Sequence, residues 1–209
     1  FVGHGYTAAL LPGIIAVSLA LSSVQSVALP MVQDFGYTRE IEDRLLAPMS
    51  MRMIGFEKIM MGIIQGLIAA AVVLPVARLI MGPIEALSGA HAALVLLFTI
   101  LGAAAFSNLG LLMGTAINPQ QIGLMFSVVV APMIFFGCAY YPWQGLTAVP
   151  IMKYAVLVNP LVYVAEGMRG ALTPGLPHMS LLAVSGALVI LVGLFWVLGM
   201  RSFEKRAFS

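Results

Sequence analysis

Five apolar segments, none of which contains Asp, Glu, Lys or Arg, dominate the pattern of hydrophobic and polar positions along the chain. A helix of about 20 residues crosses a hydrocarbon core of roughly 30 Å, and each segment is close to that length. Since lipid offers the backbone no hydrogen-bond partner, each segment should be helical, and the absence of period-two alternation excludes a barrel. The pattern therefore predicts an all-α, polytopic membrane helical bundle with five spans, over residues 7–31, 59–77, 92–117, 122–139 and 179–200.

The third and fourth spans belong to one uncharged run, residues 92–152, which is too long for a single crossing. The run is interrupted by Asn118-Pro119-Gln120-Gln121. Pro119 lacks a backbone N–H and disfavours helical backbone at Asn118. We therefore expect a tight polar turn between these two spans.

The composition agrees with a membrane protein, since 61% of the residues are hydrophobic and 9% are charged, against about 25% charged in soluble domains. A soluble protein is therefore excluded, and a formal net charge of +2 is too small to indicate nucleic-acid binding. Cys138 is the single cysteine, so no disulfide forms within the chain. The chain opens at Phe1 without the pattern of a signal peptide, and we expect one membrane domain over residues 1–209.

Half of the charged residues lie in one stretch, residues 34–58, between the first two spans. Cytoplasmic loops carry an excess of Lys and Arg. If this stretch is cytoplasmic, the C-terminal tail lies on the same side, and that side holds Arg39, Arg44, Arg52, Lys58, Arg201, Lys205 and Arg206. The opposite side holds Arg78, Lys153 and Arg169. Phe1 then lies outside, and a complete protein with a cytoplasmic N-terminus needs one more helix, six in all.

Within this stretch, residues 38–53 have a helical pattern. Apolar side chains recur every four residues, at Ile41, Leu45, Met49 and Met53. The remaining surface is charged, which is typical of an amphipathic helix at a membrane interface, and Pro48 should end or kink it. A solvated loop that only anchors two spans is an equally simple interpretation.

Residues 140–178 are too apolar for a hydrated loop and too interrupted for a clean span. Tyr and Trp side chains prefer the headgroup level, and prolines break helices. We predict a broken outer element of short re-entrant or interfacial helices, marked by Tyr140, Tyr141, Trp143, Tyr154 and Tyr163 with Pro142, Pro150 and Pro160. Glu166 and Arg169 stand three apart on a predicted helix and can pair, in a functional or a purely structural role.

Three motifs resemble one family in the same order. Residues 35–50, Phe-Gly-Tyr-Thr-Arg-Glu-Ile-Glu-Asp-Arg-Leu-Leu-Ala-Pro-Met-Ser, followed by Glu57-Lys58, resemble the cytoplasmic coupling segment of ABC-2 type permeases, the membrane subunits of bacterial ABC exporters. Residues 159–169 are similar to that family's Asn-Pro-Leu-x-Tyr motif with its trailing Arg, and Leu10-Leu11-Pro12-Gly13 resembles its second membrane helix. The family's first helix has no counterpart here, and Glu42-Asp43 replaces its frequent Gly-Thr.

The resemblance implies a multi-pass permease subunit in the bacterial cytoplasmic membrane, paired as a homodimer or with a related permease, and bound to separate ATPase subunits. It implies ATPase coupling through Arg39, Glu40, Glu42, Asp43 and Arg44. It also implies an outer gate or re-entrant element with Tyr141, Asn159, Pro160, Tyr163, Glu166 and Arg169. A P-loop needs Gly followed by Lys, which occurs nowhere in the chain, so we expect no ATPase site and no cofactor here, with ATP and Mg²⁺ bound by the partner.

Other functions have weaker support. His4, His91 and His178 lie far apart and do not predict a metal site. A secondary transporter should carry ionisable residues near the middle of its spans, and the five predicted spans contain no Asp, Glu, Lys or Arg. A membrane-embedded enzyme should bring polar catalytic groups together, and only Glu166, Arg169 and His178 are candidates for such a group. The spacings Gly62-x-x-x-Gly66 and Gly110-x-x-x-Gly114 predict close helix packing. The uncharged spans, with Phe126, Phe135 and Phe136, favour an amphiphilic, lipid-like or drug cargo, and a glycan stays open.

Overall fold

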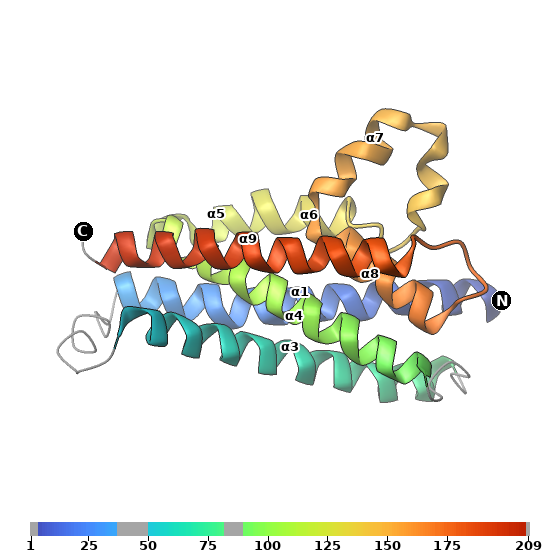
Figure 1. Cartoon of the computed structure of the whole chain (residues 1–209), viewed down its shortest axis with the longest axis horizontal. Helices are drawn as coiled ribbons and strands as arrows, with labels where there is room; N and C mark the ends of the chain where they lie inside the picture. Colours follow the sequence, from blue (N-terminus) through green and yellow to red (C-terminus); the bar gives the residue numbers. More distant parts are fainter. Residues whose placement is uncertain (1–3, 37–49, 82–89, 208–209) are drawn as a thin grey trace.

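The computed structural model describes residues 4–36, 50–81 and 90–207, and its regular structure there is entirely helical (Figure 1). Among these residues, four helices are long and apolar enough to cross a membrane. They are α1 (His4–Gly36), α3 (Met51–Met81), α4 (Ala90–Ala116) and α9 (Leu181–Ala207). The prediction of an all-α, multi-pass membrane bundle is confirmed for the described part of the chain.

The segment expected as the fourth span is not one continuous α-helix. It consists of α5 (Ile122–Met125), a π-helical turn η3 (Phe126–Val130) and α6 (Ala131–Phe135). Pro132 at the start of α6 lacks a backbone N–H, and its ring displaces the carbonyl one turn earlier, which accounts for the break. The count of five spans therefore stays a prediction. The polar turn before this segment is confirmed, because Pro119–Gln121 forms the 3₁₀ turn η2 and Gln121 N–H donates to the Asn118 carbonyl at 2.9 Å.

Three of the long helices extend beyond their apolar segments and carry charged residues at one end of the bundle. The end of α1, the start of α3 and the end of α9 lie together there (Figure 1). Lys58 Nζ donates to Asp34 Oδ2 at 2.6 Å, and Arg52 Nε donates to Glu204 Oε1 at 3.0 Å. The prediction that the 34–58 stretch and the tail share one side is therefore confirmed for the described residues, and its cytoplasmic location stays a prediction.

Helices α1 and α4 form the centre of the bundle. α4 packs against α1, α3, α8 and α9, and α1 packs against α3, α4 and α8. The two Gly-x-x-x-Gly spacings lie at these contacts, as predicted. A Cβ on Gly110 would lie 2.8 Å from the Val24 carbonyl oxygen, and one on Gly66 would lie 2.1 Å from Ser23 Oγ. The absence of side chains at these positions lets the helix backbones approach closely.

The segment after α6 folds as short helices, as expected from its prolines. These are η4 (Trp143–Ala148), α7 (Pro150–Ala155), η5 (Val156–Val158) and α8 (Pro160–Leu172). Pro150 and Pro160 occupy the first turn of α7 and α8, where the missing N–H costs no hydrogen bond. The segment η4–α7–η5, which we call the arm, projects from the bundle, and α8 returns into it (Figure 1). Re-entry of this element into a membrane stays a prediction.

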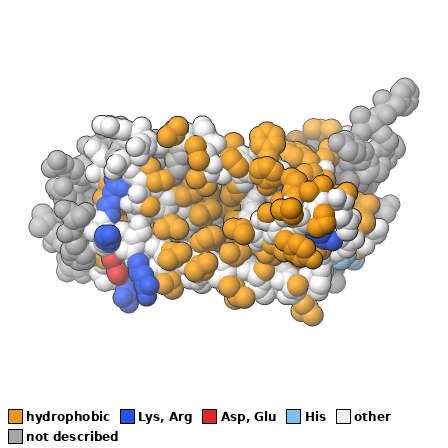
Figure 2. Space-filling view, turned by 90° about the horizontal axis from the view of Figure 1, so that it is seen from above, with side chains coloured by type: hydrophobic (Ala, Val, Ile, Leu, Met, Phe, Trp, Pro, Cys, Tyr) orange, Lys and Arg blue, Asp and Glu red, His pale blue; other side chains and the backbone are white. Residues whose placement is uncertain are grey.

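The outer surface of the long helices is mainly apolar. Exposed side chains of α3 and α9 include Met61, Ile64, Ile68, Val72, Val189, Ile190 and Leu194. Figure 2 shows hydrophobic side chains over the middle of one face and most of its charged side chains toward one end. This is the surface expected of a protein whose middle faces lipid tails.

Candidate functional site

Asn159 fixes the start of α8 and joins it to α6. Its Oδ1 accepts from Leu161 N–H at 2.9 Å, as an N-cap, and its Nδ2 donates to the Met133 carbonyl at 2.7 Å. Pro160 follows at the first helical position. Two of the predicted outer-element residues therefore act together: Asn159 caps the start of α8, and Pro160 fixes the backbone of its first turn.

Tyr163 and Tyr141 hold the ends of neighbouring short helices. Tyr163 OH donates to the Leu157 carbonyl at 2.7 Å, and Tyr141 OH donates to the Phe135 carbonyl at 3.1 Å. Burial raises the pKa of Tyr141 above its ordinary value. A tyrosine hydroxyl is protonated at neutral pH in any case, and the raised pKa extends its role as a donor to more alkaline pH.

Glu166 and Arg169 form a buried ion pair on α8, as predicted from their spacing. The two side chains are 0% and 1% exposed, and Arg169 Nη1 donates to Glu166 Oε1. Glu166 also accepts from Trp143 N–H at 2.9 Å and, through Oε2, from Met179 N–H at 2.8 Å. Arg169 Nη2 donates to the Cys138 carbonyl at 2.9 Å. The pair thus joins α8 to the turn before the arm and to the connection between α8 and α9.

This buried network has the properties of an anchor. Both carboxylate oxygens of Glu166 already accept hydrogen bonds from N–H groups, and the charge of Arg169 is neutralised within the same helix. Paired and hydrogen-bonded charges are the form in which charges persist in protein interiors. The geometry supports the structural role over a reactive one, and a gating role for these residues stays a prediction.

A polar groove runs along α1 and α3. It encloses about 390 Å³ and is lined by Ser22, Gln25, Ser26, Leu29, Pro30, Gln33 and Gln65. Gln25 lies near the middle of the span Leu10–Gly36, and Gln65 lies near the middle of the span Met51–Ile80. Both side chains are exposed on the surface of the single chain. Sequence reasoning missed this groove because uncharged Gln and Ser residues do not interrupt an apolar span, although their recurrence at 22, 25, 26 and 33 places them on one helix face.

The charged end of the bundle is tied together by side chains from three helices. Besides the two ion pairs described above, Arg206 of α9 donates to the carbonyls of Thr115 and Ile117 at 2.8 and 2.6 Å. These carbonyls belong to the end of α4 and the turn after it, where a cation also complements the helix dipole. The ends of α1, α3, α4 and α9 are therefore linked where the 37–49 segment connects α1 to α3.

A family model, ABC-2 type transporter, matches residues 4–173, from the start of α1 through α8. The chain belongs to the ABC-2 type transporter family. This confirms the resemblance found in the three sequence motifs. No curated protein matches the chain. ABC-2 transporter permeases are membrane transport components without an ATPase domain of their own, and they normally pair with an ABC ATPase subunit.

In this ABC-2 transporter chain, the residues of one of the two predicted sites lie close together. Tyr141, Asn159, Pro160, Tyr163, Glu166 and Arg169 all lie around α8. The predicted coupling residues Arg39, Glu40, Glu42, Asp43 and Arg44 lie outside the described residues, so their role stays a prediction.

Several partners in the outer element were not foreseen. Cys138, Trp143 and Met179 take part through backbone groups, for which the residue type carries no signal. His178 lies beside Met179, and its Nδ1 is 2.8 Å from the Met179 carbonyl oxygen. The prediction that Glu166, Arg169 and His178 lie near one another is therefore confirmed. Apart from the Glu166–Arg169 ion pair, their hydrogen-bond partners are backbone groups.

Proposed function

We propose that this ABC-2 transporter chain is the permease subunit of an ATP-driven exporter, which moves an amphiphilic, lipid-like, drug or glycan substrate out of the cytoplasm of a bacterium. The observation that carries the proposal is the polar groove of α1 and α3 at mid-span. Gln25 and Gln65 are exposed at mid-span, and transfer of an exposed amide into hydrocarbon costs several kcal/mol, so this face is not expected to be covered by lipid tails.

Other exposed faces of the long helices contrast with this groove. Between residues 182 and 198, the exposed residues of α9 are apolar side chains and glycine, and those of α4 between residues 93 and 100 are also apolar. Lipid can cover these faces without cost. The α1 face instead suits a second copy of the chain, placed by two-fold symmetry so that two polar stripes enclose a hydrated path. We therefore propose a homodimer with the cargo path between its two α1 helices.

The energy for transport is proposed to come from an ATPase subunit that binds ATP and Mg²⁺. This subunit would contact the amphipathic helix predicted over residues 38–53, at the end of the bundle where α1, α3, α4 and α9 are linked. The end of that prediction was wrong, because Ser50 is not helical and Met51 begins α3. Linked helix ends move together more readily than separate ones. A push on the 37–49 segment would therefore reach both α1 and α3, which line the groove.

The alternative functions gain no support from the described residues. In the four long helices, charged residues and histidines lie near the helix ends rather than at mid-span, where a secondary transporter binds its coupling ions. These residues are His4, Asp34, Arg52, Glu57, Lys58, Arg78, His91 and those from Arg201 onward. A membrane-embedded enzyme needs an accessible acid or base, and the carboxylate of Glu166 is buried and fully hydrogen-bonded.

Co-purification tests the proposal directly. The full chain, carrying an affinity tag and expressed with its chromosomal neighbours, should retain an ABC ATPase subunit in mild detergent, and the reconstituted complex should hydrolyse ATP. A chain that transports an ion-coupled solute in vesicles without ATP, and that retains no ATPase, would contradict it and favour a secondary transporter.

A further inference from the structure

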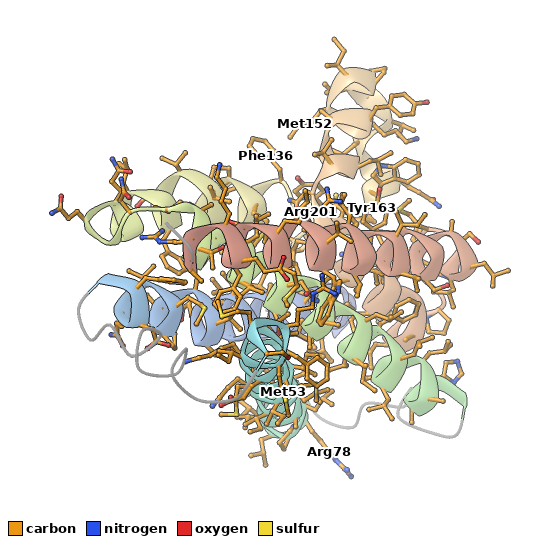
Figure 3. All side chains as sticks on the ribbon, turned by 60° about the vertical axis from the view of Figure 1, so that its left-hand side comes forward. Met53, Arg78, Phe136, Met152, Tyr163 and Arg201 are labelled. Atoms are coloured by element: carbon orange, nitrogen blue, oxygen red, sulfur yellow. The ribbon has the colours of Figure 1, made fainter. Side chains whose placement is uncertain are left out.

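A second, apolar groove lies between α6, the arm and α9. It encloses about 450 Å³ and is lined mainly by hydrophobic side chains, among them Val129, Met133, Phe136, Met152, Val156 and Phe195. Figure 3 shows the side chains of Phe136 and Met152 in the space between α6 and α7. A cavity of this size with flexible methionine side chains suits an apolar ligand of irregular shape.

The lining has a single polar side chain, and both of its polar atoms already have a protein partner. Asn159 is the polar side chain of the groove, and its Oδ1 and Nδ2 are both engaged, with Leu161 N–H and the Met133 carbonyl. A hydrophilic ligand would therefore be desolvated without compensation. The groove selects hydrocarbon.

A cation is held on the arm, next in sequence to Met152 of the groove lining. Lys153 follows Met152 on α7, and its Nζ lies 4.5 Å from the centre of the Trp143 ring. Trp143 Nε1 in turn donates to the Lys153 carbonyl at 2.9 Å, so the two residues hold each other in place. Among the described residues, no carboxylate forms an ion pair with Lys153. The cation is therefore available to an external anion.

The surroundings place this cation at the level of lipid headgroups. Trp143, Tyr140 and Tyr154 gather on or beside the arm, and such residues prefer the boundary between hydrocarbon and water. The arm also exposes large apolar side chains, with Ile151 86% and Val158 83% exposed. An apolar groove lined in part by the arm, together with an arm cation that has no carboxylate partner among the described residues, matches a molecule with hydrocarbon chains and an anionic head.

We propose that this groove binds an anionic phospholipid of the surrounding bilayer, with an acyl chain between α6, the arm and α9 and the phosphate near Lys153. The acyl chain would lie against Phe136 and Met152, and Lys153 would neutralise the phosphate of the headgroup. This site is separate from the polar groove of α1 and α3, and it does not depend on the direction of transport or on the cargo.

Native mass spectrometry of the full chain in mild detergent tests the site with two added lipids, phosphatidylglycerol and phosphatidylcholine with identical acyl chains. The wild type should retain phosphatidylglycerol more strongly, by about fivefold, the effect of one basic residue at a membrane surface. Lys153→Gln should remove this preference and Lys153→Arg should keep it, whereas Arg201→Gln, which removes an exposed cation of α9 at the other end of the bundle, should leave it unchanged.

A second pair of variants tests the groove itself. Ala155 lines the groove, so Ala155→Trp should fill it and reduce retention of both lipids, while Ala183→Trp, at an exposed position of α9 outside the lining, should change neither. Thermal unfolding of each variant verifies folding before lipid is added. Equal retention of the two lipids by the wild type, or unchanged retention by a folded Ala155→Trp protein, would overturn the proposal.

Discussion

Arg169 lies inside the protein with its charge balanced by a single carboxylate, that of Glu166 three residues before it on α8. Such a pair can contribute little net stability, because both charges lose their hydration. Its members nevertheless depend on each other, since either one alone is an uncompensated buried charge. The pair therefore acts as a specific link between α8, the arm and the connection between α8 and α9.

We predict that Arg169→Met lowers the free energy of unfolding by about 3–5 kcal/mol, because it leaves the Glu166 carboxylate buried without its cation. The double variant Glu166→Gln/Arg169→Met should lose less, since no charge is then buried. Unfolding in detergent micelles measures both, with exposed Arg201→Met as the control. A double variant as unstable as the single one would contradict this account of the pair.

Asn159 provides a second prediction. Asn159→Ala removes the N-cap of α8 and the bond to the Met133 carbonyl, and should lower the free energy of unfolding by about 1–2 kcal/mol. Asn118→Ala, at an exposed asparagine outside α8, serves as the matched control in the same unfolding assay. Equal losses in the two variants would show that the cap contributes nothing specific.

At the scale of the elements, close contact of α1 with α3 and α4 depends on glycine. A Cβ on Gly114 would lie 2.7 Å from Met31 Cβ and 2.9 Å from the Ala28 carbonyl oxygen. Gly114→Ala should therefore push α4 away from α1 and cost about 1–3 kcal/mol.

The control for this change is Gly193→Ala on α9, where an added Cβ meets nothing within 4 Å. It should be neutral or stabilising by up to about 1 kcal/mol, since alanine favours helix over glycine. Melting temperatures of the two variants decide the matter. If Gly114→Ala melts no lower than Gly193→Ala, the tight α1–α4 contact is not required.

The sequence predicted the long helices well because each apolar run has the length of a membrane crossing. It placed their ends less well. Pattern alone does not show that α1 continues to Gly36, or that α3 begins at Met51, because the added turns are stabilised by partners far along the chain, such as Lys58 for Asp34 and Glu204 for Arg52. It also gave one helix over residues 122–139, where Pro132 and a π-helical turn divide the segment.

The outer element was predictable in its residues and not in its contacts. Proline, Tyr and Trp spacing indicated short helices, and the i, i+3 spacing of Glu166 and Arg169 indicated their pairing. Their remaining partners are the backbone groups of Cys138, Trp143 and Met179. Backbone groups occur at every residue, so only the three-dimensional path of the chain selects which ones meet the pair.

At the scale of the whole molecule, charged, apolar and uncharged polar side chains lie on three different surfaces. Most of the described charged residues lie at one end, apolar side chains cover α9 between residues 182 and 198 and most of α3, and an uncharged polar stripe marks α1. The first feature fits an ATPase contact, the second fits lipid and the third fits a path between two copies. In the proposed function, these three surfaces serve the ATPase contact, the lipid and the cargo path.

Coupling to the ATPase is predicted to depend on Glu40. If the polar side of the 38–53 helix docks into the ATPase subunit, Glu40→Lys turns an attractive contact into a repulsive one and should abolish substrate-stimulated ATPase activity in the reconstituted complex. A helix-dipole effect on stability of about 0.3–1 kcal/mol is expected as well, so membrane abundance is measured in parallel. Normal abundance with unchanged stimulation and transport would refute this role and favour a solvated loop.

The most direct test of the central claim measures whether the α1 stripe faces water. In a Cys138→Ala background, which removes the single native cysteine, Gln25→Cys and Val189→Cys are each treated with a hydrophilic, membrane-impermeant maleimide in vesicles that contain the permease and ATPase subunits. Both positions are exposed on the single chain, one in the polar groove and one on the apolar face of α9. The account predicts labelling at position 25, at a rate that changes when ATP is added, and none at position 189. Equal lack of labelling at both positions would contradict a cargo path along α1.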